Sequence, residues 1–293
     1  MLVKIADLNT ADVSELKAAE DAYPIFMKSL RVDMRKHAPR PAGVHASEVS
    51  GCKRKLVYTM RGTAKEDRAS VAWKQRFKVG QALHDIMQAD LHSMAKQSNG
   101  FITFEDEVRI SPDTHTIAAK WGIHSSADGV LTFYEKKPID SKAFGQWAEG
   151  DVDCRTPIRR ILVEIKSKAP DAFDKLRAPE SDHIDQATVY MACLNIPLTW
   201  YMYWNKGDQT ITPSAGPFLQ PFDPKRWAKI EERMAEAWDY LEKEELQGKL
   251  PDSKKDEGVL CEFCPYSWTC QPGYLNNRGK RMTHLPVVKG APP

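Results

Sequence analysis

The chain has 293 residues, of which 42% are hydrophobic and 28% are charged, so it is long enough to bury the core of one large domain or two small ones. No run approaches the roughly 18 apolar residues needed to cross a bilayer, and the N-terminal segment lacks the apolar core of a signal peptide. A cytoplasmic protein without membrane attachment is therefore expected. Six cysteines are too few for a disulfide scaffold in a chain of this length.

Positive charge is concentrated in one part of the chain. The whole sequence has 42 Lys and Arg residues against 40 Asp and Glu residues, a net charge of +2. Residues 28–80 alone hold 14 basic residues against four acidic ones, a net charge of +10. This stretch predicts a phosphate-binding surface. The alternative is that its charged helices simply expose solvated faces.

The first 100 residues are predicted to be helical. Apolar residues recur at helical spacing over residues 23–30 and 73–91, and prolines and a glycine interrupt the region between them. Ser47 is expected to cap a helix whose apolar face includes Cys52. Cys52 is therefore predicted to lie within a helix.

From residue 101 the pattern changes to short extended runs that are rich in β-branched and aromatic residues. The polar segment over residues 135–157 is expected to be an excursion at the edge of the sheet. The order strand, helix, strand after residue 158 is that of a βαβ unit. We predict strands over residues 101–110, 127–134, 158–166 and 198–204, and helices over residues 182–194 and 224–247.

Glu164 and Lys166 end the predicted strand over residues 158–166. Because side chains alternate along a strand, the two project from the same face. Asp128 begins another predicted strand, where Gly129 lets the backbone turn closely, and its carboxylate joins the first if the strands pair. Two carboxylates that hold a divalent cation beside a lysine are suited to cutting phosphodiesters. A charged strand end also explains the triplet.

Three further polar residues are candidates for the same site. His84 lies on a predicted helix, where an isolated histidine is more often a surface residue than a metal ligand. Gln186 and Tyr190 are four residues apart and share one helix face, which suits hydrogen bonds to a DNA phosphate or to metal-bound water. The alternative for Tyr190 is packing against the sheet.

Cys261, Cys264 and Cys270 follow the spacing CxxCPxxxxC near the C-terminus. Three thiolate ligands on one loop need a fourth from elsewhere to complete a four-thiolate site. Zinc accepts four thiolates as readily as an iron–sulfur cluster does, so the spacing leaves both open.

The motifs GxxxH, DG, ExK and QxxxY follow one another at residues 80–84, 128–129, 164–166 and 186–190. This ordered set resembles the RecB-like nuclease branch of the PD-(D/E)XK superfamily, over about residues 45–271. The resemblance implies a metal site for Mg²⁺ or Mn²⁺, a catalytic lysine and a supporting pair. In this chain the implied ligands are His84, Asp128 and Glu164, the lysine is Lys166, and the pair is Gln186 and Tyr190.

Cys52 precedes the nuclease motifs and resembles the first cluster cysteine of the iron–sulfur nucleases related to AddB and to the CRISPR adaptation exonucleases. The resemblance implies a 4Fe-4S cluster on Cys52, Cys261, Cys264 and Cys270. The remaining cysteines are expected to be buried as small hydrophobic residues: Cys154 and Cys193.

The expected fold is α/β, with a mixed central sheet flanked by helices, as in the restriction-endonuclease-like core that the resemblance implies. The expected parts are a helical N-terminal region with the first cluster cysteine and His84, the nuclease core, a long helix with the cysteine segment, and a flexible tail. Their boundaries are predicted at residues 1–100, 101–222, 223–275 and 276–293.

The expected function is a metal-dependent DNA nuclease, foremost a single-strand exonuclease of recombination, repair or replication, acting on DNA that is single-stranded or has a free end. The sequence contains no GxxxxGKS/T loop, so any helicase or recombination partner must come from another chain. The alternative is a non-catalytic nucleic-acid-binding protein with a structural zinc ion on the four cysteines. A radical iron–sulfur enzyme fits less well because the chain has no CxxxCxxC triad.

Overall fold

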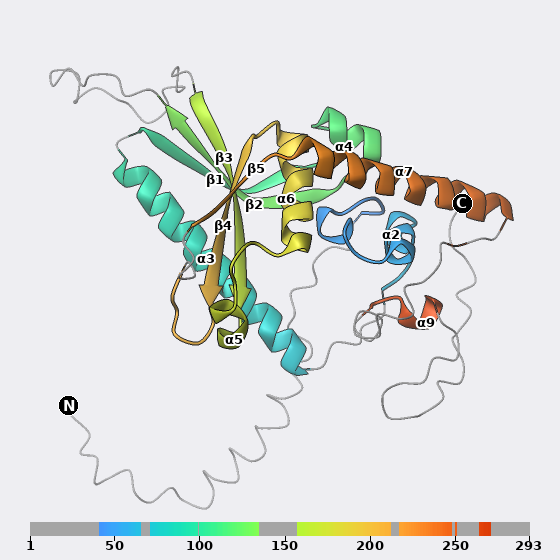
Figure 1. Cartoon of the computed structure of the whole chain (residues 1–293), viewed down its shortest axis with the longest axis horizontal. Coiled ribbons are helices and arrows are strands. Elements are labelled where there is room, and N and C mark those ends of the chain that lie inside the picture. The colour runs from blue at the N-terminus through green and yellow to red at the C-terminus, as the bar shows by residue number, and fades with distance from the viewer. Residues whose placement is uncertain are drawn as a thin grey trace, which may run out of the picture. The chain divides into compact units, whose positions relative to one another are not determined.

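A computed structural model of the chain describes residues 41–65, 71–98, 100–134, 157–211, 217–247, 250 and 264–270. This part contains a central group of strands with helices beside it (Figure 1). The elements are η2 (Ala46–Glu48), α2 (Lys53–Met60), α3 (Val71–Gln97), β1 (Ile102–Ile110), α4 (Thr116–Trp121), β2 (Ser125–Tyr134), β3 (Pro157–Lys168), α5 (Pro170–Asp174), α6 (Ser181–Leu194), β4 (Leu198–Asn205), β5 (Phe218–Pro221), α7 (Pro224–Gln247) and α9 (Ser267–Cys270).

The five strands form one mixed sheet in the order β1-β2-β3-β4-β5. β1, β2 and β3 pair antiparallel to one another, and β4 pairs antiparallel to β5. β3 and β4 are parallel and are joined through α6, which makes a βαβ unit. The predicted α/β fold with a mixed sheet between helices is therefore confirmed.

The longer predicted elements agree with the structure to within about two residues, which is the usual uncertainty of element ends. The predicted helix over residues 224–247 coincides with α7. The elements α4, α5 and β5 were not predicted, because runs of six, five and four residues are too short to show a period.

The prediction that Cys52 lies within a helix is wrong. Cys52 is the N-cap of α2, with φ −63° and ψ 129°, and the helix begins at Lys53. Ser47 lies in the short 3-10 helix η2, and the chain turns after it, with the N–H of Gly51 donating to the carbonyl of Glu48. The helical spacing of apolar residues in this region thus arises from two separate helices with a turn between them.

Several predictions fall outside the described residues. They are the helix over residues 23–30, the excursion over residues 135–156, Cys154, Cys261 and the tail over residues 276–293.

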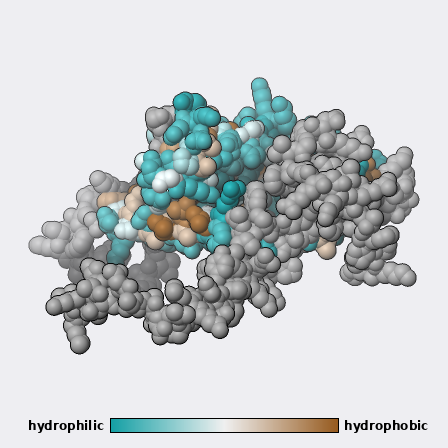
Figure 2. Space-filling view, turned by 90° about the horizontal axis from the view of Figure 1, so that it is seen from below, coloured by the Kyte–Doolittle hydropathy of each residue, from teal (hydrophilic) through white to brown (hydrophobic). Residues whose placement is uncertain are grey.

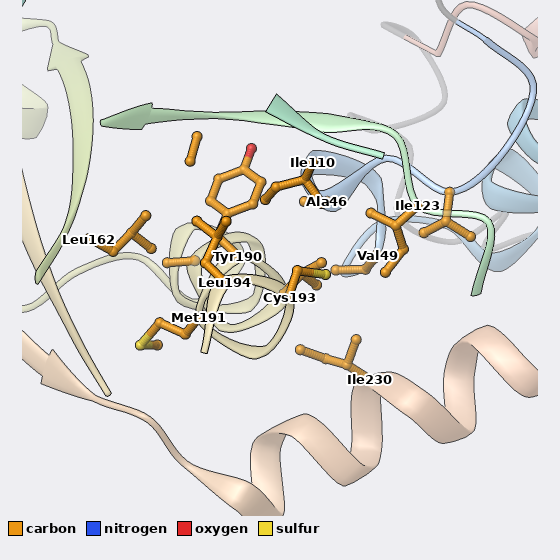
Figure 3. Close-up of a cluster of buried hydrophobic side chains, with 14 of the residues drawn as sticks. Ala46, Val49, Ile110, Ile123, Leu162, Tyr190, Met191, Cys193, Leu194 and Ile230 are labelled. Carbon is orange, nitrogen blue, oxygen red and sulfur yellow. The ribbon is translucent and has the colours of Figure 1, made fainter. Parts of the chain in front are cut away.

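Two apolar clusters cover the two faces of the sheet. The larger one lies between the sheet, α6 and α7: in Figure 3, Tyr190 points from α6 toward the strands, Leu162 comes from β3 and Ile230 comes from α7. The smaller one joins the sheet to α3 through Leu83, Met87 and other residues. The described surface in Figure 2 is mainly hydrophilic, with a limited apolar area. Among the described helices, none has the length and apolarity needed to span a membrane.

The chain divides into two compact units. One consists of Met1–Arg40 with Ala69–Gln81, and the other consists of Pro41–Arg68 with Ala82–Pro293. The residues of the metal site and of the cysteine site described below belong to the second unit, including His84 in the later part of α3.

Two leucines on strands, one buried and one exposed, test how much the larger apolar cluster contributes to the free energy of unfolding. Leu162 on β3 is 0% exposed, whereas Leu219 on β5 is 55% exposed. We expect Leu162→Ala to lower the free energy of unfolding by about 2–5 kcal/mol, because it leaves a cavity in the larger cluster. The matched control Leu219→Ala should change it by about 0.5 kcal/mol or less. Urea unfolding measures both, and equal losses would contradict the core assignment.

Candidate metal and nuclease site

The site is built where β2 and β3 separate. Their ladder ends at the pair Gly129 and Val163, although β3 continues beside β4 as far as Lys168. Beyond the last pair, the Oδ2 atom of Asp128 accepts the backbone N–H of Ile165 at 2.6 Å. A carboxylate thus takes the place that a strand carbonyl would have, and it is held beside the residues that follow Val163.

Gly129 is required here for a close approach rather than for a turn. Its backbone lies in β2, and a Cβ at this position would lie 2.3 Å from the ring of Phe104 on β1. The aromatic ring therefore packs directly onto the backbone next to Asp128. The expectation that Gly129 lets the backbone turn is corrected accordingly.

Glu164 and Lys166 project from the same face of β3, as predicted, and the Nζ of Lys166 donates to the Oε1 of Glu164. Glu164 is 0% exposed, and its Oε2 has no hydrogen-bond partner in the structure. Burial raises the pKa of Glu164 to about 7, although Lys166 opposes the shift. Burial alone would lower the pKa of Lys166, but Glu164 and Asp128 raise it overall.

His84 on α3 approaches Asp128 at Oδ1, the carboxylate oxygen that does not accept the Ile165 N–H. Its Nδ1 lies 3.5 Å from Asp128 Oδ1, and both side chains are largely covered. Burial opposes the charged form of His84, but the contact with Asp128 raises the pKa of His84 overall. Burial likewise opposes ionisation of Asp128, yet His84 and Lys166 lower the pKa of that carboxyl overall. The structure thus brings His84, Asp128, Glu164 and Lys166 together; their roles remain predictions.

Gln186 and Tyr190 share one face of α6, and the Nε2 of Gln186 donates to the Tyr190 hydroxyl at 2.9 Å. Tyr190 is 4% exposed, and its ring packs among the apolar residues between α6 and the sheet (Figure 3). The predicted proximity of the pair is therefore confirmed. The tyrosine also packs against the sheet, as the alternative expected, so a supporting role for the pair stays a prediction.

A group that the sequence reasoning missed lies at the start of α6. The ligand atoms of Glu180, Asp182 and His183 lie within 4.8 Å of one another, and no other group of three within the described ranges meets that spacing. His183 Nδ1 lies 2.8 Å from the Tyr203 hydroxyl, and Lys168 pairs with Glu180. Burial lowers the pKa of His183 to about 4, and Lys166 adds to the shift. Three potential ligands within four residues at the start of a predicted helix were the available signal.

The described cysteines of the predicted four-thiolate site lie near one another. Burial raises the pKa of the Cys264 thiol, and the nearby Cys52 and Cys270 add to the shift, whereas the Tyr266 N–H lowers it. The guanidinium of Arg54 donates to the Sγ of Cys270 at 3.5 Å. Cys193 is buried in the larger apolar cluster, as predicted for a cysteine without a ligand role.

The basic stretch over residues 28–80 is described only over residues 41–65 and 71–80. Within it, Lys53 pairs with Glu236, and Lys65 lies 3.3 Å from the buried carboxylate of Glu48. Part of its positive charge is thus offset by acidic residues of the same chain, and its DNA contacts stay a prediction.

Neither a protein-family model nor a curated protein matches the sequence. The chain is similar to the solved structure of SSO0001, with 13% identity over 86% of this chain and 96% of that chain, at a TM-score of 0.44. It is also similar to the alkaline exonuclease LHK-Exo from Laribacter hongkongensis, with 17% identity over 71% and 91% of the two chains, at a TM-score of 0.45. The complex of LHK-Exo with dAMP matches with 18% identity over 69% and 89%, at 0.42.

The raised pKa of Glu164 predicts how the stability of the metal-free protein depends on pH. Because folded Glu164 has a pKa of about 7, above its ordinary 4.5, it holds a proton more tightly folded than unfolded. Its contribution to stability is therefore fully present below the unfolded pKa and is lost as the pH rises through the folded one. The glutamine in Glu164→Gln cannot ionise, so the variant should not lose this contribution. Between acid pH and pH 8, its free energy of unfolding should rise relative to that of the wild type by on the order of 3 kcal/mol.

Urea unfolding in a chelator, at several pH values from about 4 to 8, measures this difference. A gap between variant and wild type that stays constant over that range would show that burial does not suppress the ionisation of Glu164.

Proposed function

We propose that this chain is a divalent-metal-dependent deoxyribonuclease of the PD-(D/E)XK type, acting as an exonuclease on single-stranded DNA or on DNA with a free end. The observation that carries the proposal is the state of Glu164. It is a fully buried carboxylate with one oxygen paired to Lys166 and the other without a partner, within reach of the charge of Asp128. Buried charges of this kind are retained where they are paired or coordinate a metal.

The donor set fits a hard divalent cation. Asp128 and Glu164 offer two carboxylates, which suit Mg²⁺ and Mn²⁺, and His84 adds one imidazole beside Asp128. When bound, the cation supplies positive charge that offsets the negative charge developing on a phosphodiester during hydrolysis. The hydrogen bond from Ile165 N–H leaves one oxygen of Asp128 fixed and turns the other toward His84.

Lys166 supplies the remaining chemistry. Its side chain is 19% exposed, so Lys166 is largely withdrawn from solvent while it is held by Glu164. From this position it orients an attacking water or passes a proton at Nζ. Gln186 and Tyr190, linked by their hydrogen bond on α6, are proposed to support the site by contacting DNA phosphate.

The competing function is a non-catalytic nucleic-acid-binding protein in which the acidic residues are structural and the cysteines hold zinc. The packing of Tyr190 in the core is compatible with it. The buried, half-partnered carboxylate of Glu164 favours the enzyme, because a purely structural carboxylate gains nothing from an oxygen that is desolvated without a partner.

We also propose that Cys52, Cys261, Cys264 and Cys270 hold a 4Fe-4S cluster. Of these, Cys261 lies outside the described residues. The other three fit such a group, since Cys52 and Cys270 lie near enough to Cys264 to affect its pKa, the Tyr266 N–H opposes the burial that raises that pKa, and Arg54 donates to Cys270. Hydrogen bonds and positive charge of this kind stabilise thiolates, which are the form that binds iron or zinc.

Digestion of end-labelled DNA tests the nuclease. Glu164→Gln keeps the shape of the side chain but removes its charge, so cleavage in Mg²⁺ or Mn²⁺ should fall by about 100-fold or more. Glu105→Gln, an exposed carboxylate on β1, is the matched control and should retain activity. Near-normal turnover by pure Glu164→Gln would refute the assignment. Single-stranded, duplex and circular substrates separate end-directed cleavage from internal cleavage.

Metal analysis tests the cysteine site. We expect loss of iron and sulfide and a lower melting temperature in Cys52→Ala and in Cys264→Ala. A shared cluster would connect the segment that precedes the first strand to the segment that follows the last one, and each substitution would remove that link. Cys193→Ala, which replaces a buried core cysteine, should keep its iron. Iron and sulfide per chain, with absorbance near roughly 400 nm after anaerobic purification, are the measurements. Full iron in Cys52→Ala would remove Cys52 from the site, and zinc throughout would support a structural zinc ion.

A further inference from the structure

One face of α3 holds Asp128 at two separate points. His84 approaches the carboxylate, with 3.5 Å between its Nδ1 and Asp128 Oδ1. One turn later, the Nε2 of Gln88 donates to the backbone carbonyl of Asp128 at 2.9 Å. Residues four apart lie on the same side of a helix, so one face of α3 contacts both the main chain and the side chain of Asp128.

Gln88 has a second acceptor on the neighbouring strand. Its Nε2 also donates to Glu107 Oε1 at 3.2 Å, and the other oxygen of Glu107 accepts the hydroxyl of Ser126 at 2.9 Å. The amide of Gln88 therefore links α3, β1 and β2, and both of its donor hydrogens have acceptors. Gln88 is 6% exposed, so its amide is largely shielded from solvent, whereas Glu107 and Ser126 are exposed.

The bonded segment of β1 is locally strained. Glu107 has φ +46°, in the left-handed region that residues other than glycine rarely adopt. It lies opposite Asp128 in the ladder, between the pairs Asp106 with Gly129 and Val108 with Ala127. A strained backbone persists where surrounding contacts hold it, and the bonds from Gln88 and Ser126 are such contacts.

We propose that Gln88 is a positioning residue that fixes the backbone of Asp128, so that its carboxylate stays between the Ile165 N–H and His84 when the cation binds. The proposal rests on the proposed metal-dependent function. A side chain whose own backbone is fixed and whose Oδ2 is already bonded has little freedom to turn away from a ligand position. Gln88 touches neither substrate nor cation in this role, and it acts only through Asp128 and Glu107.

Two substitutions separate the donor function from the shape of the side chain. Gln88→Met keeps an unbranched side chain that can fill the same space but removes both donor hydrogens. Gln88→Glu keeps the shape but turns an acceptor-only carboxylate toward two acceptor oxygens, so it should be the more damaging above the pKa of the new carboxyl. The matched control is Gln97→Met on the same helix, where Gln97 is exposed and donates only to Ser93.

The test is calorimetric titration of the full chain with Mn²⁺ alone, together with the EPR spectrum of bound Mn²⁺ and a thermal melt of each variant. Gln88→Met should weaken Mn²⁺ binding about 10- to 100-fold, as removal of a residue that orients a metal ligand commonly does. Its EPR spectrum should change, while Gln97→Met should match the wild type. A purely structural role would lower the melting temperature and leave the affinity and the spectrum as they are.

Wild-type affinity in Gln88→Met would overturn the proposal and leave the nuclease assignment standing. A wild-type protein that binds no Mn²⁺ would refute the proposed function, and the positioning role with it. If Gln88→Met does not fold, Gln88→Asn tests the same role. This variant keeps a buried amide, but its side chain is shorter by one methylene group and cannot reach both acceptors. Affinity equal to that of the wild type in Gln88→Asn counts against the proposal.

Discussion

The hydrogen bond from the N–H of Ile165 to the carboxylate of Asp128 is the interaction on which the site depends. It lies where β2 and β3 stop pairing, so a side chain from one strand completes the ladder of the other. A buried N–H without a partner is costly, and a short carboxylate bond removes that cost. The same bond brings Asp128 beside Glu164 and Lys166, which follow directly on β3, and leaves its other oxygen for His84.

The ionisable groups of the site shift one another's pKa values. Asp128 carries a carboxylate stabilised by His84 and Lys166, while the pKa of Glu164 rises to about 7 because burial disfavours a second negative charge there. Lys166 thus interacts with the carboxylates of both Glu164 and Asp128 in a largely buried site. Removing two like charges from solvent is expensive, and the divalent cation proposed above would reduce this cost when bound.

The cysteine segment is anchored by packing as well as by its thiols. The Tyr266 side chain is 1% exposed, its hydroxyl lies 3.2 Å from the Thr59 Oγ1, and its ring lies 5.4 Å from that of Tyr58. Tyr58 and Thr59 belong to α2, directly after Cys52 at its N-cap. Residues from both sides of the sheet-forming sequence thus meet through ordinary side-chain contacts, which brings Cys52, Cys264 and Cys270 together before any metal is considered.

The sequence by itself determined the longer elements and which of their residues share a face. Alternation predicted that Glu164 and Lys166 share a face of β3, and helical spacing predicted that Gln186 and Tyr190 meet on α6, because both relations are set by neighbours within five residues. Only the tertiary structure decided the pairing of β2 with β3, the N-cap position of Cys52, and the contacts of Gln88 with Asp128 and Glu107. These depend on packing between segments distant in the chain, and local periodicity carries no information about which distant segments will meet.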